Sequence, residues 1–328
     1  MNRAKIVHLV IADLFLPEEF SASKGLHLPY LEKMLFRGAG STSPATSMEA
    51  LLCGMFGVDA PAQVSAAFDG LADGCWLRAD PVHVRLQRDQ VVLLPNVAVR
   101  IDEAAEFCAS LNEHFRDEGL EFFAPHPERW YVRMQQSPDV VTVPLSQAAG
   151  RNIRGSLPTG KDARLLHRIF NETQMLLHAH RINEAREVPV NSLWFWGGGT
   201  GSSNAICDFA AASSDEVLVE MLAVSSHVPF TRWQPAWDGV CGLLVFCGLR
   251  SALQRGDLDA WRDALQAFET GYARPLWQAL RRGEISELRI DILGADGMQQ
   301  VHLRRADTFA FWRRSGRLSD YAGEMKLG

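Results

Sequence analysis

Apolar and polar positions alternate along this chain with two periods, one typical of strands and one typical of helices. Residues 5–13, "KIVHLVIAD", form a continuous apolar run, which predicts a strand covered on both faces. Residues 28–38 show helical spacing, and Gly38 lies where that helix should end. A loop of small residues then leads into a helix that begins near Ser47. The N-terminal part is therefore predicted to alternate strand and helix.

The rest of the chain continues this alternation. The pattern predicts two strands within 75–95, a helix over 102–117, strands over 120–125 and 129–134, a helix over 161–180, a buried strand within 238–249, a helix over 258–272 that continues from Pro275, and a closing hairpin over 287–293 and 299–305. Such an order predicts an α/β fold in which helices sandwich a mixed, mostly parallel sheet.

Composition narrows the function classes. With 47% hydrophobic and 22% charged residues, the 328-residue chain is typical of a globular protein. Its net charge of −6 comes from intermixed acids and bases, which argues against a nucleic-acid or membrane-surface binder. The longest apolar runs are strand-sized, far below the ~20 residues of a membrane helix. Six scattered cysteines without a C-x-x-C pair favour reduced thiols and a cytoplasmic protein.

An apolar run ends abruptly at three glycines in the stretch "VNSLWFWGGGTGSSN", residues 190–204. Trp194 and Trp196 alternate with other apolar residues, so both faces are apolar and a central strand is expected. The glycines permit positive φ, and their backbone N–H groups could cradle an anion.

Neither common nucleotide motif fits this stretch. A P-loop needs lysine where Ser203 stands, and a dinucleotide fingerprint needs glycine where Ser202 stands. Spacing alone slightly favours a structural turn over a ligand loop.

Four segments in order resemble archaeal-type cofactor-independent phosphoglycerate mutases of the alkaline phosphatase superfamily. "VNSLWFWGGG" is similar to the family's Asn-x-x-Trp-x-Trp-Gly-x-Gly stretch, and the others are "WLRADPVHVRLQRDQVVL", "AEFCASLNEHFRDEGLEFFAPHPERWYVRM" and "SLPTGKDARLLHRIFNETQMLLHAHRINEAR". The whole also resembles bacterial truncated homologues of that mutase, some labelled "regulatory protein" of pathogenicity-factor clusters. The resemblance implies an alkaline-phosphatase-like but reduced core from 1–70 and 200–328, with a mutase-like substrate-side region at 71–199.

The resemblance further implies catalysis with two divalent metals and a serine or threonine nucleophile. Asp13 ends the first strand where a metal ligand is expected, and Ser47 matches the nucleophile position. Each has a structural alternative, since Asp13 can cap a loop and Ser47 can cap a helix. The family's later metal-ligand segments have no counterpart after residue 200, where only His227 and His302 remain. His227 is expected in a turn and His302 on an exposed strand, so no metal site is predicted.

The substrate side of the resemblance is mixed, because the family's Pro-His-Asp corresponds to Pro144, Leu145 and Ser146 here. Arg129, Asn183, Arg186 and Asn191 match family positions, and together with Gly197, Gly198 and Gly199 they could hold an anion. The alternative is that both arginines make buried ion pairs that fix the fold. Acids that already saturate both arginines would favour this alternative.

Three hypotheses for function follow. The first is a catalytically degenerate mutase relative, a pseudoenzyme without cofactor, that binds a small phosphorylated or carboxylated ligand or a protein partner in a regulatory role. The second is a metal-dependent phosphatase or phosphotransferase that uses Ser47 and Asp13. The third is a structural or interaction protein without a ligand site.

Overall fold

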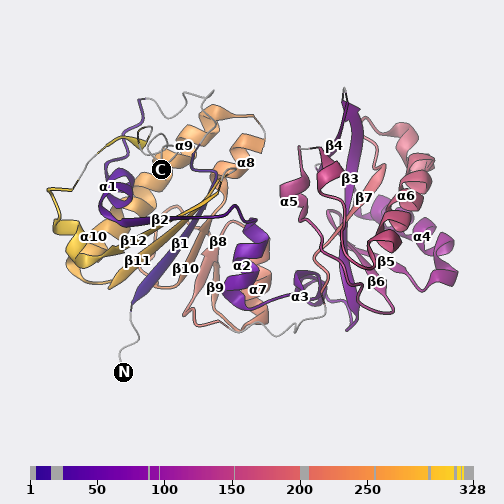
Figure 1. The fold of residues 1–328 in the computed structure, drawn as a ribbon, viewed down its shortest axis with the longest axis horizontal. Helices are drawn as coiled ribbons and strands as arrows, with labels where there is room; N and C mark the ends of the chain where they lie inside the picture. Colours follow the sequence, from indigo (N-terminus) through magenta and orange to yellow (C-terminus); the bar gives the residue numbers. More distant parts are fainter. Residues whose placement is uncertain are drawn as a thin grey trace. The chain divides into compact units, whose positions relative to one another are not determined.

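The computed structural model describes residues 5–15, 25–87, 89–95, 97–150, 152–199, 207–254, 256–294, 297–313, 316–318 and 320. The chain forms two compact units (Figure 1). Both ends of the chain build the first unit, Met1–Leu51 with Cys207–Gly328, and the second unit is Leu52–Ile206. The boundaries expected from the sequence were 70/71 and 199/200.

The first unit is built on a seven-stranded sheet in the order β2-β12-β11-β1-β10-β8-β9. Its strands are β1 Ile6–Ala12, β2 Ala39–Ser43, β8 Ala212–Ser214, β9 Phe230–Arg232, β10 Leu243–Phe246, β11 Glu287–Leu293 and β12 Met298–Arg304. All neighbours from β11 to β9 are parallel, and β12 is antiparallel to both β11 and β2. The predicted α/β class with a mostly parallel sheet flanked by helices is confirmed.

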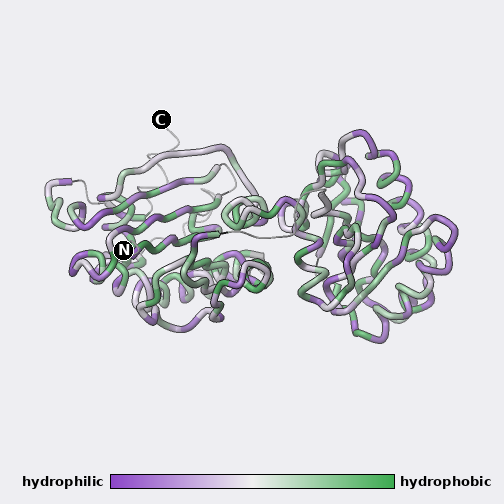
Figure 2. Tube along the Cα trace, turned by 90° about the horizontal axis from the view of Figure 1, so that it is seen from below, coloured by the Kyte–Doolittle hydropathy of each residue, from purple (hydrophilic) through white to green (hydrophobic). Residues whose placement is uncertain are grey.

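The helices of this unit follow the amphipathic patterns. They are α1 Pro29–Arg37, α2 Met48–Phe56 at the boundary, α7 Val217–Ser225, α8 Gly248–Gln254, α9 Leu258–Phe268, a π-helical turn Glu269–Ala273, α10 Arg274–Arg282 and a 3-10 helix Arg305–Phe309. The apolar sides of α1, α8, α9 and α10 pack with β1, β10 and β11 into one core. Hydropathy colouring shows the apolar segments running through the middle of the unit (Figure 2).

The second unit is an antiparallel sheet in the order β4-β3-β6-β5, with β7 paired to β3. Its strands are β3 Cys75–Gln87, β4 Gln90–Leu94, β5 Glu121–His126, β6 Arg129–Met134 and β7 Ser192–Trp196. Its helices are α3 Pro61–Phe68, α4 Ile101–His114, α5 Leu145–Ala148 and α6 Ala163–His178, with 3-10 turns at Arg116–Glu118, Ile153–Gly155 and Arg181–Ala185.

The period of two in β7 divides its side chains between two cores. Leu193 and Phe195 pack in the cluster that includes α4 and α6. Trp194 and Trp196 lie on the other face, where they pack with Val82 of β3. All five residues of β7 are buried, as the apolar run predicted.

Two local predictions are wrong. Residues 39–43, expected as a loop, form β2, which pairs with β12 although its side chains are mostly exposed. β7 is not central, since β3 is its one strand neighbour among the described residues. The strand is buried because helix α6 and the loop around Val143 cover it, and the Trp194 indole donates to the Val143 carbonyl at 2.8 Å.

Helix α1 begins at a carboxylate that is distant in sequence. Glu269, 3% exposed in the π-helical turn, accepts hydrogen bonds from the backbone N–H groups of Tyr30 (2.7 Å) and Leu31 (3.0 Å). The first N–H groups of a helix have no partner within the helix, so this carboxylate satisfies them. Burial nevertheless raises the pKa of Glu269 above its ordinary value, despite these two hydrogen bonds.

Two further findings bear on the sequence expectations. All six cysteines are unpaired. Across the described ranges, no single helix is long and apolar enough to cross a membrane, and only α2 with α3, bent by 81°, passes that test as a pair.

We predict that Trp194→Ala lowers the free energy of unfolding of the second unit by about 3–5 kcal/mol, because it removes a 2%-exposed indole and its hydrogen bond. Urea unfolding followed by circular dichroism measures the change. Leu86→Ala is the matched control, since Leu86 is 74% exposed on β3 and its loss should cost less than about 0.5 kcal/mol. Equal stability of Trp194→Ala and the wild type would contradict the structural role.

Candidate functional site

The three glycines after β7 form a turn that other backbone segments approach closely. Gly197 has φ +79°, its N–H donates to Thr142 Oγ1 at 3.1 Å, and its carbonyl accepts from Ala62 N at 2.9 Å. The Gly199 carbonyl accepts from Ser137 Oγ at 3.0 Å. A Cβ at Gly198 would lie 2.4 Å from a methyl carbon of Leu77. These contacts give the glycines a packing role.

Arg129 lies at the start of β6 and forms a fork with the carboxylate that follows α3. Its Nε and Nη2 donate to Asp69 Oδ2 and Oδ1 at 2.9 and 2.7 Å. The Tyr131 hydroxyl donates to the same carboxylate at 2.5 Å. Both oxygens of Asp69 are therefore engaged, and the two-pronged face of Arg129 is occupied by an internal acid.

The electrostatics of this group favour the ionised acid. Burial alone would raise the pKa of Asp69, but the hydrogen bonds from Arg129 and Tyr131 outweigh burial and hold that pKa below its ordinary value. Burial raises the pKa of Tyr131 well above its ordinary range, so its hydroxyl remains a donor. The group is a stable ion pair at neutral pH.

A second buried pair, Arg78 with Asp80 on β3, lies beside Tyr131. Arg78 donates through Nε and Nη2 to Asp80 Oδ1 at 3.1 and 2.6 Å, and the Trp196 indole donates to Asp80 Oδ2 at 2.7 Å. The Arg78 guanidinium also lies 5.2 Å from the centre of the Tyr131 ring and 5.3 Å from that of Trp196. Trp196 is thus both a packing residue and a hydrogen-bond donor to a buried carboxylate.

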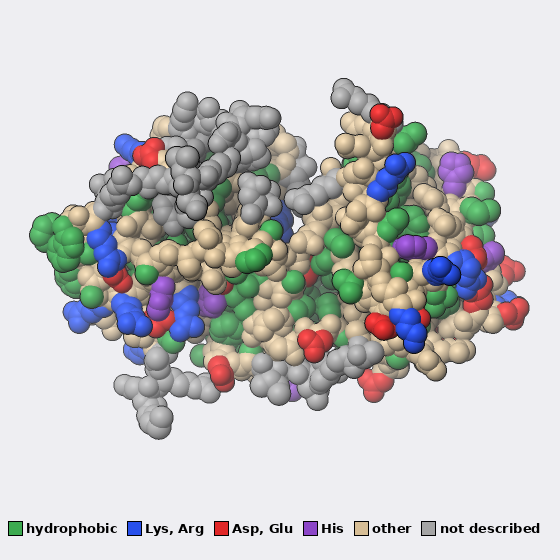
Figure 3. All heavy atoms as spheres, in the orientation of Figure 1, with side chains coloured by type: hydrophobic (Ala, Val, Ile, Leu, Met, Phe, Trp, Pro, Cys, Tyr) green, Lys and Arg blue, Asp and Glu red, His purple; other side chains and the backbone are tan. Residues whose placement is uncertain are grey.

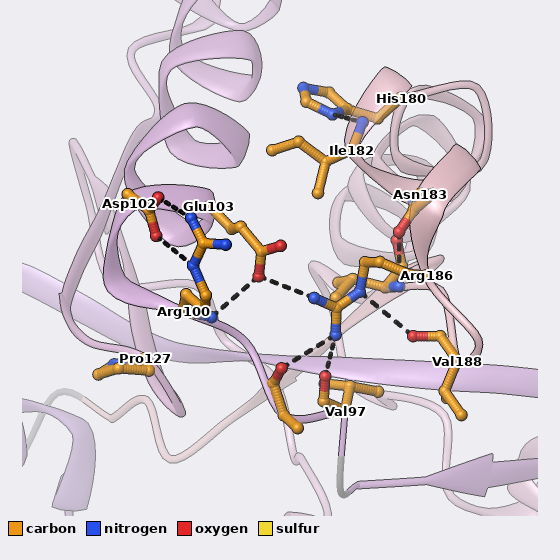
Figure 4. Close-up of polar contacts among 12 residues, drawn as sticks. Val97, Arg100, Asp102, Glu103, Pro127, His180, Ile182, Asn183, Arg186 and Val188 are labelled. Atoms are coloured by element: carbon orange, nitrogen blue, oxygen red, sulfur yellow. Dashed lines mark hydrogen bonds and ion pairs between the residues drawn. The ribbon is translucent and has the colours of Figure 1, made fainter.

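Arg186 follows the 3-10 turn after α6 and is surrounded by acceptors (Figure 4). Its Nη1 lies 2.8 Å from Glu103 Oε2, its Nη2 donates to the carbonyls of Val97 and Ala98, and its Nε donates to the Val188 carbonyl at 3.3 Å. Each of the three guanidinium nitrogens has an internal acceptor. Its contacts therefore support the structural alternative, as those of Arg129 do.

The two asparagines of the resemblance bind backbone. Asn183 donates to the carbonyls of Leu177 and Val190 at 2.6 and 2.9 Å and accepts from Val190 N at 2.9 Å. Asn191 bonds with both the N–H and the carbonyl of Val84, at 2.7 and 2.8 Å, and so extends the pairing of β7 with β3. Both side chains act as substitutes for strand hydrogen bonds.

The predicted ligand residues do not share one contact network. Asn191 precedes β7 and Gly197 follows it, so the five-residue strand separates them by roughly 20 Å. Asn183 binds Val190 beside Asn191, at the start of β7. Arg129 is linked through Asp69 to the end of α3, whose start meets Gly197. These contacts do not form one anion site in the second unit.

The topology of the first unit places a switch point between β10 and β8, at the carboxyl ends of its parallel strands. The chain leaves β8 through α7 toward β9 at the edge, whereas it leaves β10 through α8, α9 and α10 toward β11 on the other side. Neighbouring strands whose connections run in opposite directions define the place where α/β sheets bind ligands. The residues at or just beyond these strand ends are Asp13 after β1, Asp215 and Glu216 after β8, and Cys247 and Arg250 after β10. We call them the carboxyl-edge site.

Asp13 in this site is paired with a cation of the same chain. Its φ is +56°, and its Oδ2 accepts from Arg250 Nε at 2.7 Å. The Trp261 indole donates to the Asp13 carbonyl at 3.2 Å and so fixes this turn. Burial would lower the pKa of Arg250, but the attraction and hydrogen bond of Asp13 outweigh burial and raise it.

The other acids of the site satisfy backbone N–H groups. Asp215 Oδ1 accepts from Cys247 N at 2.7 Å, at the start of α8, and Glu216 Oε1 accepts from Leu218 N at 3.4 Å, at the start of α7. Burial raises the pKa of both carboxyl groups above their ordinary values. Burial also raises the pKa of the Cys247 thiol far above its ordinary value, which makes it a poor nucleophile.

Ser47 is the N-cap of α2. Its Oγ accepts from Ala50 N at 2.9 Å, and the residue is 6% exposed. Within the described residues, no three His, Cys, Asp or Glu side chains are grouped so that they could hold a metal ion. His227 lies in a turn with φ +57°, as expected, and His302 on β12 contacts Glu287 at 2.6 Å.

The ion-pair partners of Arg129, Arg186 and Asp13 were not predicted from the sequence. Asp69 and Glu103 carried no signal beyond being acids, and Arg250 lay inside a short helix without a recognised motif. Asp80 could have been found, because the Arg78-Ala79-Asp80 triplet was part of the resemblance.

The chain is similar in fold to solved structures, but the comparisons do not show its family. No family model matches the chain, and no curated protein matches it. The PH0037 protein from Pyrococcus horikoshii is similar in structure, with 14% identity, a TM-score of 0.53 and a match over 98% of this chain and 92% of that one. A cofactor-independent phosphoglycerate mutase from Thermoplasma acidophilum has 12% identity and a TM-score of 0.43 over 97% and 95%. The similarity to the Pyrococcus protein shows the fold alone.

We predict that Asp69→Asn lowers the free energy of unfolding by about 2–4 kcal/mol at pH 7, because it leaves Arg129 without its acid. Folding lowers the pKa of Asp69, so its charge contributes fully to stability above the unfolded-state pKa of about 4. This contribution to stability is lost as the pH falls through the lower pKa of the folded state. Urea unfolding at several pH values should show the difference between wild type and variant shrinking below about pH 4. The control is Asp102→Asn, because Asp102 is exposed in its pair with Arg100 and should matter little. A pH-independent difference would argue against the ion pair as the cause.

We also predict that Gly198→Ala destabilises the second unit by about 1–3 kcal/mol, because the added methyl would overlap buried Leu77. Gly54→Ala provides the control, since its Cβ would meet nothing within 4 Å in helix α2 and should be neutral or stabilising. Thermal unfolding measures both changes. An unchanged melting temperature for Gly198→Ala would show that the turn has room for a ligand.

Proposed function

We propose that this chain is a non-catalytic relative of cofactor-independent phosphoglycerate mutases. In this proposal it binds a small carboxylated or phosphorylated ligand at the carboxyl-edge site in a regulatory role. The observation that carries the proposal is the state of Arg250. Its Nε is held by Asp13, and among the described residues neither of its terminal nitrogens has a hydrogen-bond partner. Two adjacent donors on a fixed, planar cation match the two oxygens of a carboxylate or phosphate.

The surrounding acids do not remove this binding capacity. Asp215 and Glu216 accept hydrogen bonds at the starts of α8 and α7, where the positive ends of the helix dipoles offset their charge. Asp13 pairs with the Nε side of Arg250, and the charge of Glu49 also acts on the guanidinium, but no acid among the described residues forms an ion pair with its terminal nitrogens.

Support for a non-catalytic role comes from the same contacts. The two residues that the resemblance assigns to catalysis are engaged elsewhere, since Asp13 pairs with Arg250 and the Ser47 hydroxyl caps α2. A nucleophilic serine requires a base or a metal to activate it. Ser47 accepts a backbone hydrogen bond instead, which ties its oxygen to the helix start.

We expect wild-type protein to bind 3-phosphoglycerate or inorganic phosphate in calorimetric titrations, and Arg250→Ala to weaken binding at least about tenfold, or ~1.4 kcal/mol. Arg250→Lys keeps the charge but loses the planar pair of donors, so it should also bind more weakly while folding normally. Arg168→Ala, which removes an exposed arginine of α6, is the control and should bind as wild type does.

Two outcomes would contradict this proposal. Unchanged binding by a folded Arg250→Lys variant would place the anion elsewhere. Hydrolysis of a generic phosphate ester in the presence of manganese or zinc that Ser47→Ala abolishes would establish the metal-dependent phosphatase alternative.

A further inference from the structure

Three aromatic side chains near the end of the described chain are unusually exposed. Phe311 is 81% exposed, Trp312 73% and Phe309 46%, and the Phe311 and Trp312 rings meet edge to face with their centres 5.2 Å apart. Exposed apolar clusters of this kind mark interaction surfaces, and Trp and Phe are enriched at protein interfaces. Figure 3 shows hydrophobic side chains gathered beside Lys and Arg side chains at the end of the first unit near α10.

The charges beside these rings are positive. The Arg281 guanidinium lies 5.5 Å from the centre of the Phe309 ring, and Arg305 Nε donates to the Arg281 carbonyl at 3.1 Å. Neither arginine forms an ion pair with an acid in the described part of the chain, whereas the nearby Arg313 is neutralised by Asp307. We call Phe309, Phe311, Trp312, Arg281 and Arg305 the aromatic patch.

A groove with an apolar lining lies on the second unit between α4 and α6. Its volume is about 740 Å³. Apolar side chains that line it are Ala109, Met175, Leu176 and Ala179, and Met175 is 74% exposed. A cavity of this size can enclose a ligand of several rings. We call it the α4–α6 groove.

The rim of the α4–α6 groove carries one glutamate that has no ion-pair partner among the described residues. Glu106, Glu113 and Glu172 line it, together with Arg181 and the histidines His114 and His180. Arg181 neutralises Glu106 at 2.7 Å, and Glu172 is shared between Arg168 and His114. Glu113 is exposed and forms no ion pair among the described residues. Its free carboxylate can therefore meet an incoming guanidinium.

We infer that the aromatic patch of one molecule docks into the α4–α6 groove of a second copy of this chain. The rings of Phe311 and Trp312 would fill the apolar part of the groove, while Arg281 or Arg305 would meet Glu113. Aromatic and arginine side chains supply most of the binding energy at protein interfaces. Both surfaces belong to the same chain, so they are present at equal concentration. The net charge of −6 disfavours a nucleic acid or an anionic membrane as the partner.

This contact is heterologous, because the two surfaces that meet are different. When two copies join through a heterologous contact, one copy of each surface stays free to bind a further molecule. Dimers and larger species therefore become more abundant as the protein concentration rises. We therefore expect sedimentation velocity to show an average mass that rises above that of the 36.5 kDa monomer as the protein is concentrated.

Variants of exposed residues test the contact without disturbing the fold. Phe311→Ser with Trp312→Ser should raise the apparent dissociation constant at least about tenfold, whereas Leu86→Ser, an equally exposed apolar site outside both surfaces, should not change it. Glu113→Lys should weaken association, and the triple variant Glu113→Lys with Arg281→Glu and Arg305→Glu should restore part of it. Circular dichroism verifies the fold of each variant.

Several results would overturn the inference. The first is a wild-type protein that remains monomeric at all concentrations. The second is self-association that the Phe311 and Trp312 changes leave intact. Binding of monomeric protein to vesicles of anionic phospholipid, lost on Trp312→Ser, would assign the patch to a membrane instead. None of these outcomes depends on Arg250, so this test and the ligand titration can fail separately.

Discussion

A charge removed from water must find a partner, and this chain supplies that partner from within at most of the positions where a ligand was expected. Asp69 engages Arg129, Glu103 and two backbone carbonyls engage Arg186, and Asp13 engages Arg250. In the second unit these pairs join the sheet to α3 and the end of α6 to the start of α4. The residues that resemble a substrate site therefore hold elements together.

The same constraint shapes the helix starts of the first unit. A helix leaves its first N–H groups without partners, and carboxylates from elsewhere in the chain accept from them here. Glu269 serves α1 from 238 residues away, and Asp215 serves the start of α8 from 32 residues away. Each carboxylate joins a helix to an element that is remote in sequence. At the carboxyl edge of the sheet, Asp13 is held by Arg250 and by the Trp261 indole, and Asp215 is held by the start of α8.

Sequence patterns predicted what depends on local periodicity. The apolar run of β1, the paired strands β3 and β4, and the spacing of α4, α6 and α9 all appear within a few residues of the expected bounds. β2 was missed because its residues, Ala39–Ser43, are small and mostly exposed, so no apolar alternation marks it. The ion pairs were beyond prediction, since Arg250 and Asp13 are 237 residues apart and only the folded sheet brings them together. Residue type predicted that each arginine would need a partner, but not which one.

Arg129 and Arg186 differ from Arg250 in how many of their donors have internal partners. Arg129 donates through Nε and Nη2 to Asp69, and Arg186 donates through all three guanidinium nitrogens to Glu103 and backbone carbonyls. An anion that took the place of these acceptors would leave an internal partner unsatisfied. Such a displacement costs the desolvation of a buried carboxylate, typically 1–3 kcal/mol or more. At Arg250 the acid occupies one edge of the guanidinium only, and an anion at the other edge would add hydrogen bonds without breaking any. If this chain binds a small anion as proposed, the anion would therefore meet fewer internal partners at Arg250 in the first unit than at Arg129 or Arg186 in the second.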